Sequence, residues 1–255
     1  MKIDQVGVQL YTLRNFCKTA VEYAATLKQV RKIGYRAIQI SAVGPIPPED
    51  LRRIAEGEGL TIAATHEPGA VILSEPQKVV ERLGILGCRY TAYPGPVIPM
   101  DDLGQVEQLI AQLDAAGEVL QKAGQVLAYH NHSQEFYRLV GKTVLERIYE
   151  NTKPEHLQGE LDTYWVQAGG GDSAKWCRRL KGRLPLLHIK DYAVDPMRVP
   201  YYAEIGHGNL DFPEIIAAAE ESGCEWFIVE QDICPGSPFD SLRKSFDYIR
   251  DHLIS

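Results

Sequence analysis

The sequence predicts an α/β protein with a single (β/α)8 barrel over residues 1–255. Eight short apolar runs alternate with longer amphipathic segments along the chain, and this alternation is typical of successive strand–helix units. Eight units in about 250 residues is the usual size of such a barrel. A doubly wound sheet usually has fewer strands and often a glycine-rich phosphate turn. No such turn follows the first run, and no linker divides the chain.

The expected strands are runs of about five β-branched or apolar residues bounded by Gly or Pro. They are predicted at Val6–Leu10, Ala37–Ile40, Thr61–Thr65, Arg89–Ala92, Val126–His130, Gln158–Leu161, Leu186–Ile189 and Trp226–Val229. Parallel pairing of all eight would close the barrel.

The expected helices are the amphipathic segments between these runs. They are predicted at Ala20–Ile33, Glu49–Glu58, Gln77–Leu86, Val106–Ala123, Thr143–Glu150, Ser173–Leu180, Pro213–Ser222 and Ser237–Leu253. Several of them are followed by a glycine, as at Gly34, Gly124 and Gly223. Glycine tolerates a positive φ and therefore often ends a helix.

Composition narrows the function classes. A hydrophobic content of 45% can form a sizeable core. No apolar run is long enough to cross a bilayer, and the N-terminal MKIDQVGVQL lacks the features of a signal peptide, so we expect a cytoplasmic protein without membrane contact. A net charge of −7 disfavours nucleic-acid binding, which depends on clustered Lys and Arg. The expected partner is a small neutral molecule, and a homo-oligomer is left open.

The cysteines give no sign of a disulfide framework or of a nucleophile. Five of them are scattered without C-x-x-C spacing, at Cys17, Cys88, Cys177, Cys224 and Cys234. An odd number outside a secretory context indicates reduced thiols.

Polar side chains gather where the predicted strands end. Active sites of this fold lie at the C-terminal ends of the strands, so these residues are candidates for one site. They are Gln9, Tyr11, Arg14, His66, Glu67, His130, Asn131, His132, Glu135, Glu160, Asp162, His188, Lys190, Asp191, Glu230 and Asp232.

Taken singly, each of these residues has an ordinary structural explanation. His66 is typical of a hydrogen-bonded structural histidine, Asp162 of a helix cap, and Lys190 can pair with Asp191 at the surface. Together, several carboxylates and imidazoles around one axis would repel one another or stay unsatisfied without a cation. Mixed nitrogen and oxygen ligands favour one divalent ion such as Mn²⁺, Co²⁺ or Zn²⁺ over Ca²⁺, with Mg²⁺ a further candidate.

The motifs QLYTLR, GYRAIQIS, YHNH, LDTYW, LLHIKD, EIGHGNLDF and VEQD occur in this order along nearly the whole chain. In this order they resemble the sugar phosphate isomerase/epimerase family with the xylose-isomerase-like barrel. That family includes ketose 3-epimerases, hydroxypyruvate isomerases, inosose dehydratases and lyases of keto-sugars, with endonuclease IV as a distant relative. The resemblance implies a metal-dependent enzyme acting on a carbohydrate.

In that family, a Glu, an Asp, a His and a Glu after strands five to eight hold one divalent ion. The resemblance therefore implies Asp162, His188 and Glu230 as ligands, and His130 falls on the fifth-strand glutamate position. Glu135 is either a ligand in its place or a nearby acid/base group. The family also often has a histidine three residues after the aspartate, where this chain has Trp165. An indole can stack on a sugar but cannot carry a proton.

The chemistry implied is proton removal next to a carbonyl that the cation polarises, through an enediolate. Glu230 and Glu135 are the candidate bases. Replacing the fifth-strand glutamate by an imidazole disfavours epimerisation by two opposed carboxylates. The expected substrate-binding residues are Gln9, Tyr11, His66, His132, Trp165, Lys190, Glu204 and His207. His207 can equally be an ordinary loop residue.

Several function classes remain open. Return of the proton to the neighbouring carbon gives an isomerase or epimerase. Loss of a hydroxyl or alkoxide gives a dehydratase or lyase acting on a keto-sugar, inosose or keto-glycoside. An endonuclease IV-like repair enzyme would need a basic surface, which the net charge of −7 opposes. A non-catalytic sugar-binding protein is the remaining class. Without a cluster of Lys or Arg at a glycine-rich turn, an unphosphorylated substrate is expected.

Overall fold

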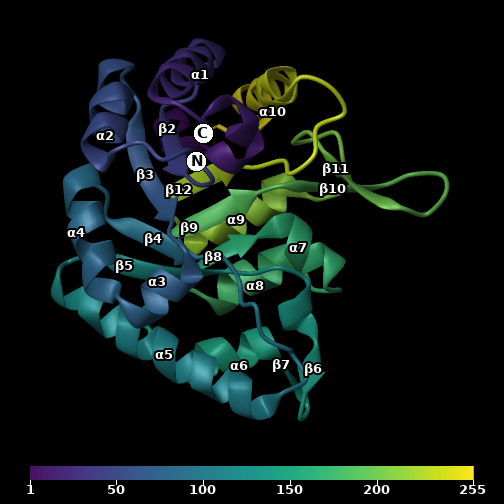
Figure 1. Ribbon diagram of the computed structural model, residues 1–255. Helices are drawn as coiled ribbons and strands as arrows, with labels where there is room; N and C mark the ends of the chain where they lie inside the picture. The colour runs from purple at the N-terminus through teal and green to yellow at the C-terminus, as the bar shows by residue number, and fades with distance from the viewer. Residues whose placement is uncertain (255) are drawn as a thin grey trace.

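Eight parallel strands form a closed barrel in the computed structural model, which describes residues 1–254 (Figure 1). The strands are β1 (Val6–Gln9), β2 (Ala37–Ile40), β3 (Thr61–His66), β4 (Tyr90–Tyr93), β5 (Val126–His130), β8 (Leu157–Asp162), β9 (Leu186–Ile189) and β12 (Trp226–Val229). Each follows its predecessor around the barrel, and β12 closes on β1. The predicted (β/α)8 barrel is therefore confirmed, with strand ends within one residue of those expected.

Helices surround the strands as an outer layer (Figure 1). They are α1 (Ala20–Ile33), α2 (Pro48–Gly57), α3 (Gly69–Ser74), α4 (Pro76–Leu86), α5 (Leu103–Lys122), α6 (Val144–Glu150), α7 (Thr163–Ala168), α8 (Ser173–Arg179), α9 (Phe212–Glu221) and α10 (Pro238–His252). Short 3₁₀ segments are η1 (Ile3–Gln5), η2 (Leu10–Phe16) and η3 (Gln134–Phe136). Among the helices of the described residues, none is both long and apolar enough to cross a membrane.

Local chemistry fixes several helix starts. Thr19 accepts a hydrogen bond from the Glu22 backbone N–H, and the Glu22 carboxylate accepts from the Thr19 backbone, so α1 begins with a reciprocal capping box. Asp162 at the end of β8 caps α7 by accepting from the Trp165 N–H at 2.9 Å. The cap makes the strand end and the start of α7 one rigid unit.

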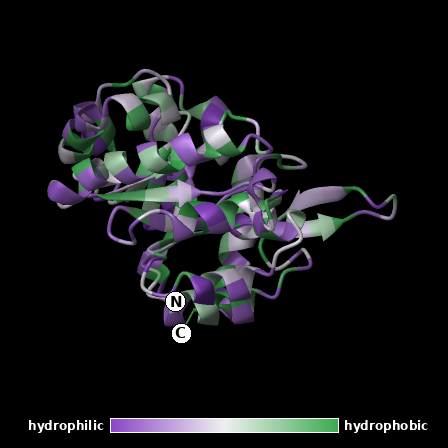
Figure 2. Ribbon diagram, turned by 90° about the horizontal axis from the view of Figure 1, so that it is seen from below, coloured by the Kyte–Doolittle hydropathy of each residue, from purple (hydrophilic) through white to green (hydrophobic). Residues whose placement is uncertain are grey.

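Two hairpins interrupt the strand–helix alternation. One pairs β6 (Arg138–Leu139) with β7 (Lys142–Thr143), and the other pairs β10 (Asp191–Val194) with β11 (Pro200–Ala203). The second hairpin follows β9 and projects away from the barrel in both views (Figures 1 and 2). It carries Tyr202 near its base.

The barrel interior has an apolar layer below a polar one. Side chains on a strand alternate between its two faces, so residues two apart share a face. Ala128 and His130 share one face of β5, Leu186 and His188 share one face of β9, and Ile228 and Glu230 are spaced in the same way at β12. The lower layer is a buried cluster of Ala64, Tyr90, Ala92, Ala128, Leu186 and Ile228. The polar groups therefore lie directly above a layer of packed apolar side chains.

A buried arginine joins the opposite end of the barrel to α6. The Arg183 guanidinium donates to the carbonyls of Leu157 and Tyr149, each at 2.6 Å, and to Thr152 Oγ1 at 2.6 Å. Its bonds to Tyr149 and Thr152 satisfy oxygens at the C-terminal end of α6, and its bond to Leu157 fixes the start of β8.

We expect Arg183→Met to lower the free energy of unfolding by roughly 2–4 kcal/mol, because four buried oxygens, including the Thr152 carbonyl, lose a donor that apolar packing cannot replace. Arg178→Met is the matched control, since Arg178 forms ion pairs with Glu214 and Glu221 on the surface and should cost far less. Urea unfolding followed by circular dichroism compares the two variants. Equal losses would show that the Arg183 bonds add nothing beyond a surface ion pair.

Candidate active site

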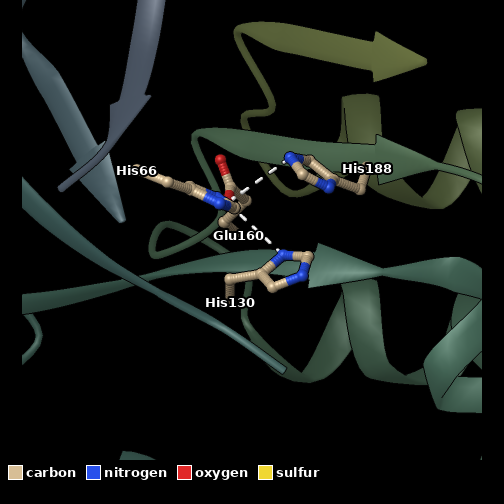
Figure 3. A group of neighbouring side chains, drawn as sticks. All are labelled: His66, His130, Glu160 and His188. Atoms are coloured by element: carbon tan, nitrogen blue, oxygen red, sulfur yellow. Dashed lines mark hydrogen bonds and ion pairs between the residues drawn. The ribbon is translucent and has the colours of Figure 1, made fainter. Parts of the chain in front are cut away.

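Three imidazoles surround one buried carboxylate at the C-terminal end of the barrel (Figure 3). Glu160 Oε2, from β8, lies 2.5 Å from His66 Nε2 and 3.4 Å from both His130 Nδ1 and His188 Nε2. The histidines come from β3, β5 and β9, so four strands contribute to the cluster. Although burial opposes ionisation, His188 and His66 hold the pKa of Glu160 well below its usual range.

A second cluster brings together the four residues that the family resemblance implied as metal ligands. One potential ligand atom from each of His130, Asp162, His188 and Glu230 lies within 4.8 Å of the others, and all four residues are buried. His188 Nδ1 is 3.1 Å from Glu230 Oε2 and 3.9 Å from Asp162 Oδ2. The two clusters share His130 and His188.

The donor set of this second cluster fits a divalent cation. Within residues 1–254, His130 Nδ1 and Asp162 Oδ2 are buried and have no hydrogen-bond partner. Each has a charged group at 3.4 Å, Glu160 Oε2 for His130 and Lys190 Nζ for Asp162, but a buried polar atom without a hydrogen bond is costly. Two imidazoles and two carboxylates form the mixed nitrogen and oxygen set that suits a borderline divalent ion. A cation among the four residues would give these buried groups a direct partner in place of the distant ion pairs.

Glu160 is better suited to support this cluster than to hold an ion itself. Its Oε1 accepts from Gln39 Nε2 at 2.7 Å, while Gln39 Oε1 is 2.6 Å from His188 Nε2 and accepts from Gln9 Nε2 at 3.1 Å. An amide oxygen only accepts, so His188 Nε2 carries a proton and Nδ1 faces Asp162 and Glu230. Holding the far nitrogen of a histidine in this way is the usual support of a metal ligand.

The imidazoles differ in protonation. Burial, followed by the neighbouring His188, holds the pKa of His130 well below its usual range, so its ring is neutral with a free lone pair. Although burial disfavours the charged ring, Glu160 and Glu230 raise the pKa of His188 to about 10. A cation bound at His188 Nδ1 would have to displace the proton there.

The two ligand carboxyls also differ. Burial raises the pKa of Asp162 to about 7, despite the attraction of the Lys190 ammonium. For Glu230, Lys190 and His188 together outweigh burial and hold the pKa well below its usual range. Glu230 is therefore the carboxylate that stays ionised at neutral pH.

Lys190 lies inside the site rather than at the surface. Its ammonium, in a side chain that is 1% exposed, is 2.7 Å from Asp232 Oδ2, 3.1 Å from Glu230 Oε2 and 3.4 Å from Asp162 Oδ2. Surface pairing with Asp191, which the sequence left open, is therefore wrong. Asp191 instead accepts backbone N–H groups of the loop that begins at Gly206.

Aromatic rings surround the same ammonium. Lys190 Nζ lies 5.2 Å from the ring centres of Trp165 and Tyr202 and 5.9 Å from that of Tyr164. Rings at these distances attract a cation and exclude water. Together with the three carboxylates, they hold Lys190 charged despite its burial, and its pKa is raised.

A cavity of about 500 Å³ opens above these groups. Its lining residues are Tyr11, Arg14, Ser41, His66, Pro94, His130, His132, Trp165, Lys190, Tyr202, Glu230, Asp232 and Ile233. Of the residues predicted to bind substrate, Tyr11, His66, His132, Trp165 and Lys190 line the cavity. Gln9 is fully buried, with its amide on Gln39 and 3.4 Å from His66 Nδ1.

Three predicted site residues point elsewhere. Glu135 is buried in the η3 turn, where its carboxylate accepts from the Tyr129 hydroxyl at 3.0 Å and from the His132 backbone N–H at 2.8 Å. Glu204 accepts from Ser241 Oγ at 3.0 Å and lies 3.4 Å from Lys244 Nζ, both on α10. His207 is exposed beside Tyr248. Glu135 joins neither cluster, so the geometry gives no support to its role as base or reserve ligand.

Sequence reasoning gave no role to three residues of this site, although Glu160 was among the candidates at the strand ends. Glu160 precedes Asp162 by two positions, so strand periodicity alone would have placed both on one face of β8. Gln39 stands in the GYRAIQIS motif but was given no role. Tyr202 carried no local signal, because the hairpin that positions it was not predicted.

The chain matches a known family model and a known protein over most of its length. The model of the family described as "Xylose isomerase-like TIM barrel" matches residues 27–252. An inosose dehydratase of Geobacillus kaustophilus is 23% identical over 270 residues, covering 89% of this chain and 86% of that protein.

Solved structures share the fold. A sugar phosphate isomerase/epimerase of Parabacteroides distasonis superposes with a TM-score of 0.84 at 24% identity, covering 99% of this chain and 96% of the other. A xylose isomerase-like TIM barrel protein of Mycobacterium smegmatis in complex with magnesium has a TM-score of 0.75 at 15% identity, covering 97% and 95%.

Proposed function

The chain belongs to the xylose isomerase-like TIM barrel family, and from this premise we propose a metal-dependent enzyme that removes a proton next to the carbonyl of a sugar or sugar derivative. The observation that carries the proposal is the buried group of His130, Asp162, His188 and Glu230 beneath an open cavity. Two of its atoms, His130 Nδ1 and Asp162 Oδ2, have no hydrogen-bond partner among the described residues.

These four residues would hold the ion. When bound, a divalent ion at this position polarises a substrate carbonyl and makes the neighbouring C–H more acidic. Glu230 is the base that takes the proton, because it is ionised and lines the cavity. The Lys190 ammonium, 3.1 Å from Glu230 Oε2, is placed to stabilise negative charge that develops on substrate oxygens.

The fate of the proton separates isomerisation from elimination. We propose isomerisation or epimerisation as the first candidate, since the family contains such enzymes. Dehydration is the second candidate, supported by the inosose dehydratase relative and by one feature of the cavity. The carboxylates that line it, among residues 1–254, are Glu230 and Asp232, both from the end of β12. Epimerisation by two opposed carboxylates would require another on the facing wall.

The cationic groups of the cavity favour an unphosphorylated substrate. Arg14 donates to the Tyr11 carbonyl at 2.8 Å and to the Asp232 carbonyl at 3.1 Å. Lys190 is neutralised by its three carboxylates. A phosphate would have to displace these partners, whereas sugar hydroxyls can share them.

Solvent exchange tests the proposal. The protein, purified with its metal, is incubated in heavy water with a panel of unphosphorylated keto-sugars and inososes, and products are analysed by mass spectrometry. We expect one carbon-bound deuterium in the substrate or product, with loss of water if the reaction is a dehydration. Metal-stripped protein is the control and should show no exchange. Turnover without any exchange would point to hydride transfer and overturn the proposal.

A further inference from the structure

A second cavity, called the side cavity below, lies next to the main cavity of the site. It has a volume of about 350 Å³ and is lined by Pro94, Gly95, Pro96, His132, Ser133, Gln134 and Trp165. Pro94, His132 and Trp165 also line the main cavity. The two cavities therefore adjoin at these three residues.

The outer wall of the side cavity is a constrained loop. Gly95 has a φ of +113°, and a Cβ built there would lie 2.9 Å from His132 Nδ1. Only glycine lets the loop pass so close to this ring. Prolines flank it on both sides, and Gln134 Nε2 donates to the Pro96 carbonyl at 3.3 Å, which ties the loop to η3.

The shared wall consists of aromatic rings held by the site itself. The ring centres of His132 and Trp165 are 5.3 Å apart. The Trp165 backbone N–H is bonded to Oδ1 of Asp162, a proposed metal ligand, at 2.9 Å. The backbone that carries the indole is therefore tied to a proposed metal ligand.

The lining of the side cavity matches an uncharged ring. No Lys, Arg, Asp or Glu stands among its lining residues, which offer two prolines, an indole, an imidazole, one hydroxyl and one amide. Apolar surfaces with a few polar groups are typical of small-molecule pockets, and an indole stacks on the flat face of a sugar or aromatic ring. An engineered cavity of about 150 Å³ in another protein already holds benzene, so this space accommodates a six-membered ring.

We propose that the side cavity is a subsite for an uncharged second ring attached to the reacting sugar. The inference rests on the proposed function, because it assumes that the first ring lies in the main cavity. The preferred substrate is then a keto-sugar carrying a glycosidically linked sugar or an aromatic group, rather than a free monosaccharide.

The test compares substrates with one and two rings. The substrates are a hexose whose ketone lies away from the anomeric carbon, its phenyl glycoside, and a disaccharide in which it is linked through its anomeric carbon, so that the ketone stays intact in all three. Each is assayed by the deuterium exchange described above, and kcat/KM is measured for each. We expect the two-ring substrates to be favoured by at least tenfold. The phenyl and disaccharide arms distinguish an aromatic from a sugar second ring.

A substitution that fills the side cavity tests whether this cavity causes the preference for two-ring substrates. Ser133→Phe places a ring into the side cavity and should remove the tenfold preference, whereas Ser74→Phe, at the exposed end of α3, should keep it. Calorimetry measures how tightly unreactive methyl and phenyl glucosides bind to the metal-stripped protein, without turnover. The wild type and Ser74→Phe should bind the phenyl glucoside more tightly than the methyl glucoside, and Ser133→Phe should lose this preference. Exchange with all substrates but no two-ring preference would overturn the subsite alone. Exchange with none of them would overturn the proposed function, and calorimetry would then decide the subsite separately.

Discussion

Glu230→Gln is expected to lower kcat by roughly 10²–10⁴-fold, the usual contribution of a general base. The amide keeps an oxygen that can face a cation but cannot accept a proton from carbon. Glu230 is the proposed base because it lines the cavity. Lys190 and His188 hold its pKa well below the usual range, so it is ionised across the neutral range and able to accept a proton. Glu135→Gln should cost much less, since that carboxylate bonds to Tyr129 and the His132 backbone outside the cavity.

Metal content must be measured alongside kcat, because Glu230 is proposed both as a ligand and as the base. Full metal occupancy with lost deuterium exchange in Glu230→Gln would assign the loss to proton transfer. Lost metal would assign it to the ligand role, and adding excess metal ion should then restore part of the activity. Wild-type kcat in this variant would remove Glu230 as the base.

The barrel could be predicted because its signals are local. Each strand is a short apolar run, and α1 lies between its cap residues Thr19 and Gly34, both of which are types typical of helix ends. The elements that were missed are short. Six residues of α7 show too little periodicity to be recognised, and the hairpin β10–β11 lies where a loop was expected. These two elements carry Trp165 and Tyr202.

The direction of side chains at the rim was harder to predict than their presence there. Strand ends predicted which residues reach the rim, and His130, Asp162, His188 and Glu230 do converge. Beyond the last strand residue, the turn decides where a side chain points. Glu135 follows β5 by five positions, and the η3 turn directs it back onto Tyr129.

The charge balance of the site depends on contacts that no local pattern encodes. Lys190 and Asp191 are adjacent in sequence, at the junction between β9 and β10, but their side chains have different partners. Lys190 points to the carboxylates of Asp162, Glu230 and Asp232. Its ammonium reduces the repulsion among them, which helps to keep the buried Asp162 and Glu230 close to the partly buried Asp232.

Asp162→Ala is expected to abolish stoichiometric metal binding while the barrel stays folded. The side chain is fully buried, and its Oδ2 has no hydrogen-bond partner in the described part of the chain. Losing one proposed ligand weakens such a site strongly, but the apolar layers of the barrel do not depend on it. Asp162 also caps α7, so removing it should cost about 1 kcal/mol of stability.

Because Asp162 also caps a helix, the control variant removes an aspartate cap from a different helix. Asp172→Ala removes another aspartate cap, at the start of α8, where Oδ1 accepts from the Lys175 N–H at 3.0 Å. We expect a similar loss of stability in thermal unfolding, with full metal occupancy by elemental analysis after dialysis. Asp162→Asn should keep the cap of α7 and still bind metal poorly, because the amide carries no charge. If Asp162→Ala retains one equivalent of metal, Asp162 is not a ligand, and the ion lies elsewhere, most directly in the cluster of His66, His130, Glu160 and His188.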